Sequence, residues 1–280
     1  AAIDTLGGEF VRDVEPGELV ILHPEGEGFD GYQLVEADHT AHCFFEHVYF
    51  ARPDSVIDDH LVYEVRRELG RALWEESGVE TDVVMPVPDS GRAFASGYAE
   101  AAAEDHTAVE FAEGLMKNRY VGRTFIMPTQ EMREQAVRLK LNPIRSTVEG
   151  KSVTIIDDSI VRGTTSNQLV TLLREAGAAE VHLRIGSPPI LAPCYMGIDM
   201  ATREELIAAD RDVDEIRETI DADSLSYLSI DAVARALESE RIDLCLGCVT
   251  GEYPYDVEGE ATDRDVTRPA IGEHEASADD

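Results

Sequence analysis

Lysine is nearly missing from this sequence of 280 residues: its 24 basic residues include only Lys117, Lys140 and Lys151, against 57 acidic residues. The formal net charge is −33. Because a field of that sign repels phosphate backbones and anionic lipid surfaces, nucleic acids and membranes are excluded as expected partners. An acidic, lysine-poor surface is also typical of proteins from salt-rich environments, where dissolved ions screen the repulsion, so we expect a halophilic source.

The sequence also lacks long apolar runs. No segment reaches the roughly 18 apolar residues that a membrane span requires, and no export signal follows Ala1. We therefore expect a cytoplasmic protein, with a length that suits one or two domains and a substantial core. The chain starts with Ala1 rather than Met, and Leu6-Gly7-Gly8 is typical of the interior of a domain, so we expect a fragment or a processed chain.

Cysteine is scarce as well, and its four positions are Cys43, Cys194, Cys245 and Cys248. The last two form a Cys-Leu-Gly-Cys pair. A chain without an export signal is not expected to carry a disulfide framework. A Cys-x-x-Cys pair has three common interpretations: a redox dithiol, half of a zinc site or half of an iron–sulfur site. Its spacing alone does not separate zinc from iron–sulfur.

One stretch holds the strongest local pattern in the chain. The apolar run Val153–Ile156 predicts a strand covered on both faces, and it ends in two acids, Asp157 and Asp158. A loop of hydroxyl residues, one arginine and Gly163 follows, and then a helical pattern begins. The next apolar run, Val181–Ile185, completes a predicted β-α-β unit, in which ligands bind beyond the carboxyl ends of the strands.

The helix of that unit is predicted by apolar residues at helical spacing: Leu169, Leu172, Leu173 and Ala176. Thr165 or Ser166 is expected to cap its first turn, and Gly177 to end it. Backbone N–H groups of the loop and of the helix N-terminus suit a phosphate, and the two acids suit ribose hydroxyls and a divalent cation. The alternative is an ordinary strand–helix connection with incidental acids. The order of strand, acids, hydroxyls and glycine favours a site for a phosphorylated sugar.

Other elements are predicted around this unit. A helix is expected from Asp58 to Gly78, and a buried strand over 83–87. The loop Pro88-Asp89-Ser90-Gly91 follows that strand, and then a helix over about 93–104. The region after Ile198 is predicted to be mostly helical, and the polar, acidic residues 256–280 are expected to be disordered.

Positive charge gathers in one part of the chain, residues 117–147, where seven bases stand against two acids. The bases are Lys117, Arg119, Arg123, Arg133, Arg138, Lys140 and Arg145. Two of the three lysines lie here, and both arginine and lysine bind phosphate, so this segment is predicted to bind an anion. The alternative is a solvated basic face that pairs with the acidic remainder of the chain.

The string Asp-Asp-Ser-Ile-Val-Arg-Gly-Thr-Thr, residues 157–165, resembles the phosphoribosyl-pyrophosphate (PRPP) loop of type I phosphoribosyltransferases. Its form resembles that of amidophosphoribosyltransferases, also called glutamine PRPP amidotransferases. Four further segments are similar to the same family: Tyr49–Ser55, Val87–Ser90, Lys117–Ile126 and Ser187–Pro189. The resemblance covers roughly residues 5–256.

The resemblance implies an α/β chain with the type I phosphoribosyltransferase fold, in which helices flank a parallel sheet. Residues 1–40 are then expected to be a remnant β segment from the end of a glutaminase domain, with its linker. Residues 41–255 are expected to form the phosphoribosyltransferase domain, and 256–280 the acidic tail.

The resemblance further implies the first step of de novo purine (IMP) biosynthesis, in which PRPP and ammonia give 5-phosphoribosylamine and pyrophosphate. In the whole family protein the ammonia comes from glutamine through an N-terminal cysteine. Here Ala1 stands first, so no glutaminase activity is expected from this chain alone. A homo-oligomer and feedback inhibition by purine nucleotides are also implied. A PRPP-binding regulator without turnover and a salvage transferase that uses a purine base are the alternatives.

Roles for single residues follow from the same resemblance. Asp157 and Asp158 are expected to hold the ribose hydroxyls and, together with Ser90, Mg²⁺. The 5′-phosphate is expected to bind through Ser159, Arg162, Gly163, Thr164 and Thr165. Pyrophosphate is expected to leave beside Ser90, with its charge neutralised by Lys117, Arg119 and Arg123. The segment of these three bases matches a loop that closes over PRPP in the family.

The four cysteines match the branch of the family that holds a [4Fe–4S] cluster. Cys43 lies before the Phe-Glu-x-x-Tyr-Phe-type segment, Cys194 follows Ser-Pro-Pro, and Cys245 and Cys248 lie near the end of the matched region. The resemblance thus implies these four as ligands of a structural cluster, with zinc or unligated cysteines as the alternatives.

Overall fold

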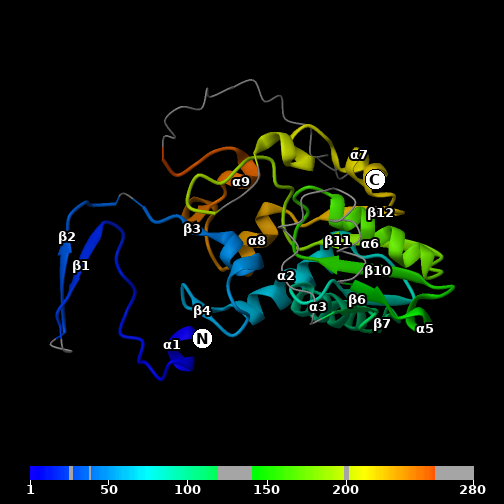
Figure 1. Ribbon diagram of the computed structural model, residues 1–280, viewed down its shortest axis with the longest axis horizontal. Coiled ribbons are helices and arrows are strands. Elements are labelled where there is room, and N and C mark those ends of the chain that lie inside the picture. The colour runs from blue at the N-terminus through cyan, green and yellow to red at the C-terminus, as the bar shows by residue number, and fades with distance from the viewer. Residues whose placement is uncertain (25–27, 38, 119–140, 199–201, 256–280) are drawn as a thin grey trace, which may run out of the picture.

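The computed structural model describes residues 1–24, 28–37, 39–118, 141–198 and 202–255. At its centre lies a five-stranded sheet in the order β12-β11-β10-β6-β7 (Figure 1). Its strands are β6 (Val83–Pro86), β7 (Glu110–Phe111), β10 (Ser152–Asp157), β11 (Glu180–Ile185) and β12 (Ser224–Tyr227). The pairings within this sheet are parallel, so the predicted parallel sheet is confirmed and its strands end at one common edge.

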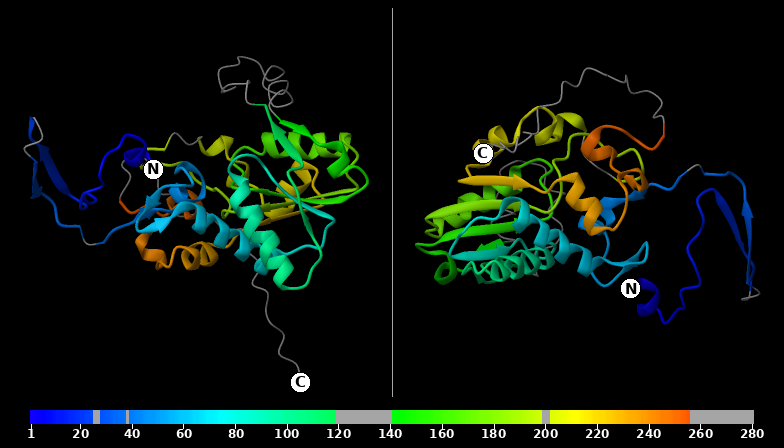
Figure 2. Two further views of the ribbon diagram at one scale, coloured as in Figure 1. Left: turned by 90° about the horizontal axis from the view of Figure 1, so that it is seen from below. Right: turned by 180° about the vertical axis from the view of Figure 1, so that it is seen from behind.

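Helices flank both faces of the sheet (Figure 2). They are α2 (Val62–Ser77), α3 (Gly91–Glu104) and α8 (Ile230–Ala236) on one face, and α6 (Thr164–Glu175) and α7 (Val213–Ile220) on the other. Ile156 of β10 joins the core of the first face, while its neighbour Ile155 joins the core of the second. Because successive side chains of a strand point to opposite faces, a strand covered on both sides is apolar throughout, as the run Val153–Ile156 predicts.

Smaller elements complete the described chain. The helical ones are α1 (Ala2–Thr5), η2 (Glu46–Phe50), α5 (Arg145–Val148), η3 (Arg203–Glu205), η4 (Ile207–Ala209), η5 (Arg241–Asp243) and α9 (Gly247–Thr250). The strands are β1 (Glu18–Leu22), β2 (Phe29–Gln33), β3 (His42–Cys43), β4 (Val56–Ile57), β5 (His60–Leu61), β8 (Leu115–Lys117), β9 (Leu141–Pro143) and β13 (Leu244–Cys245). β1 and β2 form an antiparallel hairpin that projects away from the sheet and its helices, as Figures 1 and 2 show. No described helix is long and apolar enough to cross a bilayer.

Three sequence predictions about elements need correction. α2 begins at Val62 rather than at Asp58, because Asp58 and Asp59 have φ angles of +49° and +62°, outside the helical region. The described part of the region after Ile198 is mostly helical as predicted, but the prediction missed its edge strand β12. Neither Thr165 nor Ser166 caps α6, because both lie inside that helix and Gly163 occupies the capping position. The predicted disordered tail, 256–280, lies outside the described residues.

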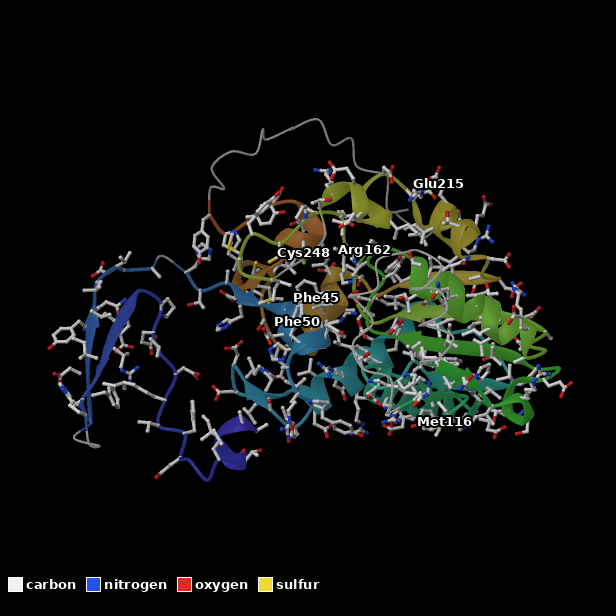
Figure 3. All side chains as sticks on the ribbon, viewed as in Figure 1. Phe45, Phe50, Met116, Arg162, Glu215 and Cys248 are labelled. Carbon is white, nitrogen blue, oxygen red and sulfur yellow. The ribbon has the colours of Figure 1, made fainter. Side chains whose placement is uncertain are left out.

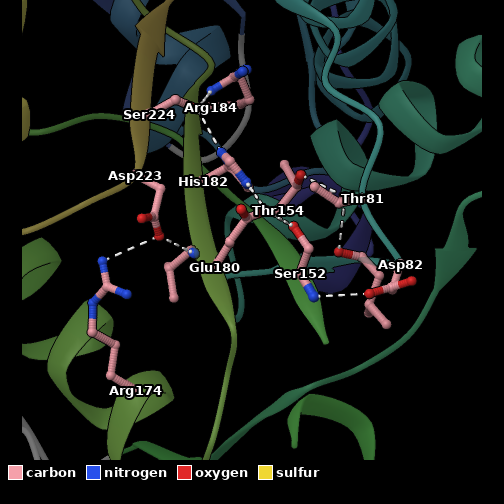
Figure 4. A network of polar contacts seen from close by, with 12 residues as sticks. Thr81, Asp82, Ser152, Thr154, Arg174, Glu180, His182, Arg184, Asp223 and Ser224 are labelled. Atoms are coloured by element: carbon pink, nitrogen blue, oxygen red, sulfur yellow. Dashed lines mark hydrogen bonds and ion pairs between the residues drawn. The ribbon is translucent and has the colours of Figure 1, made fainter. Parts of the chain in front are cut away.

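A polar network ties the strands together at their amino-terminal ends (Figure 4). An Asp82 carboxylate oxygen accepts a hydrogen bond from the Ser152 backbone N–H at 2.9 Å, and an Asp223 carboxylate oxygen accepts one from the Val181 N–H at 2.6 Å. The hydroxyls of Thr81 and Thr154 lie 2.8 Å apart. Side chains therefore satisfy the backbone at this edge, and the ligand-binding side of a parallel sheet is the opposite one.

Candidate active site

Two acids end the central strand of the sheet. The Asp158 N–H donates to an Asp157 carboxylate oxygen at 2.9 Å, and the Ser159 hydroxyl donates to Asp158 at 2.6 Å. Asp158 is buried and Asp157 is half-buried. β10 lies between β6 and β11, so these carboxylates stand at the middle of the carboxyl edge.

The surroundings of this acid pair disfavour the charged form of both carboxyl groups. Burial raises the pKa of Asp157 well above its usual value, and the charge of Asp158 raises it further. Burial also raises the pKa of Asp158, against hydrogen bonds from the Ser159 and Ser90 side chains, which lower it. Ser90, from the loop after β6, thus lies beside Asp158. An acid pair with one buried and one half-buried carboxylate beside these neighbours favours hydroxyl donors or a cation as its ligands.

The loop after the acids leads into α6 through Gly163. Its φ angle is +74°, the left-handed conformation that glycine adopts without strain. A Cβ atom at this position would lie 2.4 Å from Cδ1 of Ile207, so the loop also packs closely against η4. Because Gly163 has no side chain to cap α6, the backbone N–H groups of its first turn are left for a ligand, and an anion suits them.

The bases expected at this site are paired with acids. Nζ of Lys117, the last residue of β8, lies 2.6 Å from an Asp89 carboxylate oxygen. Arg162, labelled in Figure 3, donates from Nη2 to Glu205 at 3.0 Å. Lys117 therefore reaches the loop after β6, which also carries Ser90. Arg119 and Arg123 lie outside the described residues.

The structure thus brings part of the predicted set together. Ser90, Asp157, Asp158 and Ser159 adjoin one another at the carboxyl edge of β6 and β10. Arg162, Gly163, Thr164 and Thr165 follow on the same loop and at the start of α6. Of the seven bases between residues 117 and 147, only Lys117 and Arg145 belong to the described chain.

Sequence reasoning missed Arg66, a buried base in α2. Its Nε donates to the His47 carbonyl at 2.7 Å and its Nη2 to the Ala51 carbonyl at 2.9 Å. Burial lowers its pKa, while the negative charge of Asp158 raises it. Position 66 lies four residues after Val62 and three before Leu69, on the apolar face of the helix. A single base among apolar residues at this spacing could have identified Arg66 from the sequence.

The four cysteines come from segments far apart in the sequence. Cys43 of β3 stands opposite Cys245 of β13 in a parallel pairing, and the Cys248 carbonyl accepts hydrogen bonds from Leu191 and Ala192, shortly before Cys194. Burial raises the pKa of Cys248 to about 12, and the charges of the other three cysteines add to it. All four thiols are free of disulfides. Within the described residues, however, no three His, Cys, Asp or Glu side chains are arranged as a metal-binding group.

Comparison with known proteins agrees with this architecture. Residues 58–185 match the family model described as "Phosphoribosyl transferase domain". The amidophosphoribosyltransferase of Methanothermobacter thermautotrophicus is 53% identical over 269 residues, which span 95% of this chain and 55% of that protein. The Bacillus subtilis amidophosphoribosyltransferase is 49% identical over 260 residues, 91% of this chain and 53% of that one.

Solved structures give the same result. The B. subtilis glutamine PRPP amidotransferase complexed with ADP and GMP has a TM-score of 0.83 and 48% identity, over 92% of this chain and 56% of that one. A structure described as the allosteric regulatory enzyme of purine biosynthesis has a TM-score of 0.82 and 49% identity, over 92% and 55%. The type I phosphoribosyltransferase fold predicted from the sequence is therefore confirmed. The chain spans about half the length of the relatives it matches.

Proposed function

Since this chain belongs to the amidophosphoribosyltransferase family and spans about half the length of its relatives, we propose that it forms 5-phosphoribosylamine and pyrophosphate from PRPP and ammonia. The observation that carries the proposal is the meeting of Ser90, Asp157 and Asp158 at the carboxyl edge, beside the start of α6. In the longer relatives' reaction this would be the step that builds the first intermediate of purine biosynthesis.

The acid pair and the loop after it divide the substrate between them. Asp157 and Asp158 accept hydrogen bonds from the ribose hydroxyls, which supply the donors that buried carboxylates need. The 5′-phosphate binds the first turn of α6 through backbone N–H groups and the hydroxyls of Ser159, Thr164 and Thr165, with Arg162 as its counter-charge. Negative charge beside the ribose also stabilises the positive charge that develops on the anomeric carbon as pyrophosphate leaves.

Lys117, Arg119 and Arg123 neutralise the departing pyrophosphate. Ser90, Asp157 and Asp158 offer the oxygen ligands that Mg²⁺ prefers, and a bound Mg²⁺ would supply further neutralisation of the pyrophosphate oxygens. Ammonia attacks the anomeric carbon through its nitrogen lone pair, and the C–O bond to pyrophosphate breaks. The excess proton on nitrogen is then lost to solvent or to pyrophosphate.

The four cysteines are proposed to hold a [4Fe–4S] cluster that joins β3, β13, α9 and the segment at Cys194. Free thiols from four positions, two of them opposed across a strand pairing, suit a cluster with cysteine ligands. Zinc would use the same donors. Anaerobic purification followed by optical spectroscopy and iron analysis separates the two, since a colourless, zinc-loaded protein would contradict the cluster.

The reaction is tested by measuring pyrophosphate release from PRPP with ammonia, with free purine bases and with glutamine. Release with ammonia alone is expected. Release with a purine base would indicate a salvage transferase, and PRPP binding without release would indicate a regulator. Release with glutamine would contradict the sequence prediction that this chain does not act as a glutaminase.

Regulation and assembly remain proposals too. The ADP and GMP in the B. subtilis structure support purine nucleotides as inhibitors of this chain. The homo-oligomer, the cytoplasmic location, the halophilic source and the division of the chain at residues 40 and 255 stay predictions from sequence.

A further inference from the structure

Lys117 belongs to a chain of alternating charges, and the proposed reaction does not use the other residues of that chain. One carboxylate oxygen of Asp89 lies 2.6 Å from Nζ of Lys117, and the other lies 3.2 Å from Nη1 of Arg92. Arg92 in turn donates from Nε to Glu113 at 3.0 Å and from Nη2 to the same carboxylate at 3.3 Å. Among the described residues, the order is therefore Glu113, Arg92, Asp89, Lys117.

The pair that involves Lys117 is the one that a ligand can exchange. The side chains of Asp89 and Lys117 are 57% and 36% exposed, so water and salt screen their attraction. The two bases use different oxygens of Asp89. Lys117 can therefore leave Asp89 while Arg92, fixed by Glu113, keeps its own contact, and the carboxylate is not left without a cation.

The Asp89–Lys117 pair lies where the substrate is proposed to bind. Asp89 is the neighbour of Ser90, which lies beside Asp158, and Lys117 ends the strand that reaches this loop. A polyphosphate that binds here meets Lys117 already paired with a carboxylate. An ammonium group binds more strongly to a partner with more negative charge and more acceptor oxygens, and pyrophosphate has more of both than the Asp89 carboxylate.

We propose that Asp89 is a positioning residue that holds Lys117 at the site as a resting counter-ion and gives it up to the pyrophosphate group of the substrate. The inference rests on the proposed function. Asp89 fixes the ammonium group where the leaving group will lie, and the exchange lowers the affinity for pyrophosphate by the strength of the pair that must first break.

The test is calorimetric titration of the whole chain with inorganic pyrophosphate, with and without Mg²⁺, at fixed ionic strength. Asp89→Asn keeps the shape of the side chain and removes its charge, and is expected to bind pyrophosphate about two- to fivefold more tightly without Mg²⁺, the range for an exposed ion pair. In a Lys117→Met background the same substitution is expected to change the affinity by less than about twofold, because the pair is already absent.

Two matched variants control for charge. Glu113→Gln removes one negative charge near Asp89, from a residue that pairs with Arg92. Glu110→Gln breaks an exposed pair with Lys151, 3.1 Å long, at the amino-terminal ends of the strands. Both are expected to bind pyrophosphate as the unmodified chain does. Equal tightening in Glu113→Gln would show a general field effect and overturn the inference.

The remaining outcomes separate this inference from the proposed function. If the unmodified chain binds pyrophosphate and Asp89→Asn binds it equally well or more weakly, the role of Asp89 alone is overturned. Weakening seen only with Mg²⁺ would place Asp89 at the cation instead and would also overturn it. An unmodified chain that binds no pyrophosphate under either condition would overturn both.

Discussion

Gly163→Ala tests the geometry of the loop between the acid pair and α6. The substitution forces an L-residue to adopt a φ of +74°, which costs about 1–2 kcal/mol. The new Cβ would also lie 2.4 Å from Cδ1 of Ile207, a side chain that is only 4% exposed, and such overpacking adds about 1–3 kcal/mol. We therefore expect the free energy of unfolding to fall by about 2–5 kcal/mol.

Gly150 provides a matched control for the backbone component. Its φ is also +74°, but a Cβ there would meet nothing within 4 Å, so Gly150→Ala is expected to cost about 1–2 kcal/mol. Denaturant unfolding of both variants in high salt gives the two values. Equal losses would refute the contact with Ile207, and a Gly163→Ala protein with unchanged stability and PRPP affinity would refute the loop geometry altogether.

Two further predictions concern His47 and the cysteines. Burial lowers the pKa of His47 below its usual 6.5, so the unfolded chain takes up more protons there and stability falls as pH drops below about 6.5. As the pH falls from about 7.5 to 5.5, His47→Leu should lose less stability than the unmodified chain in denaturant unfolding. Identical pH slopes for the two proteins would contradict the lowered pKa of His47. Cys245→Ser is expected to lose most of its iron and to unfold at lower denaturant than the unmodified chain, whereas retained iron would remove Cys245 from the proposed ligands.

The local pattern of the sequence predicted the β10–α6 unit well, because its signals are short-range. The apolar run, the acids and the glycine lie within eleven residues of each other, and each depends on neighbours in the chain. The edge strand β12 was missed because its four residues, Ser224–Tyr227, are too few and too polar for a strand pattern. The start of α2 was misplaced because propensity does not report the positive φ angles of Asp58 and Asp59.

The meeting of residues across the sheet was less predictable. Ser90 lies beside Asp158 only because β6 and β10 are neighbouring strands. The local sequence of neither strand predicts which strand it pairs with. The pairing of Lys117 with Asp89 depends on side-chain positions 28 residues apart. The sequence marked Lys117 as a base that binds an anion, and the structure adds the carboxylate that holds it.

The most direct test of the central claim compares Asp157→Asn with the unmodified chain in ammonia-dependent release of pyrophosphate from PRPP. The substitution keeps the size of a side chain at the end of β10 and removes the carboxylate that is proposed to hold the ribose and the cation. A fall in turnover of at least about a hundredfold is predicted, the size of effect that follows loss of one electrostatic contact at a reacting centre. Near-normal ammonia-dependent release by Asp157→Asn would contradict the account.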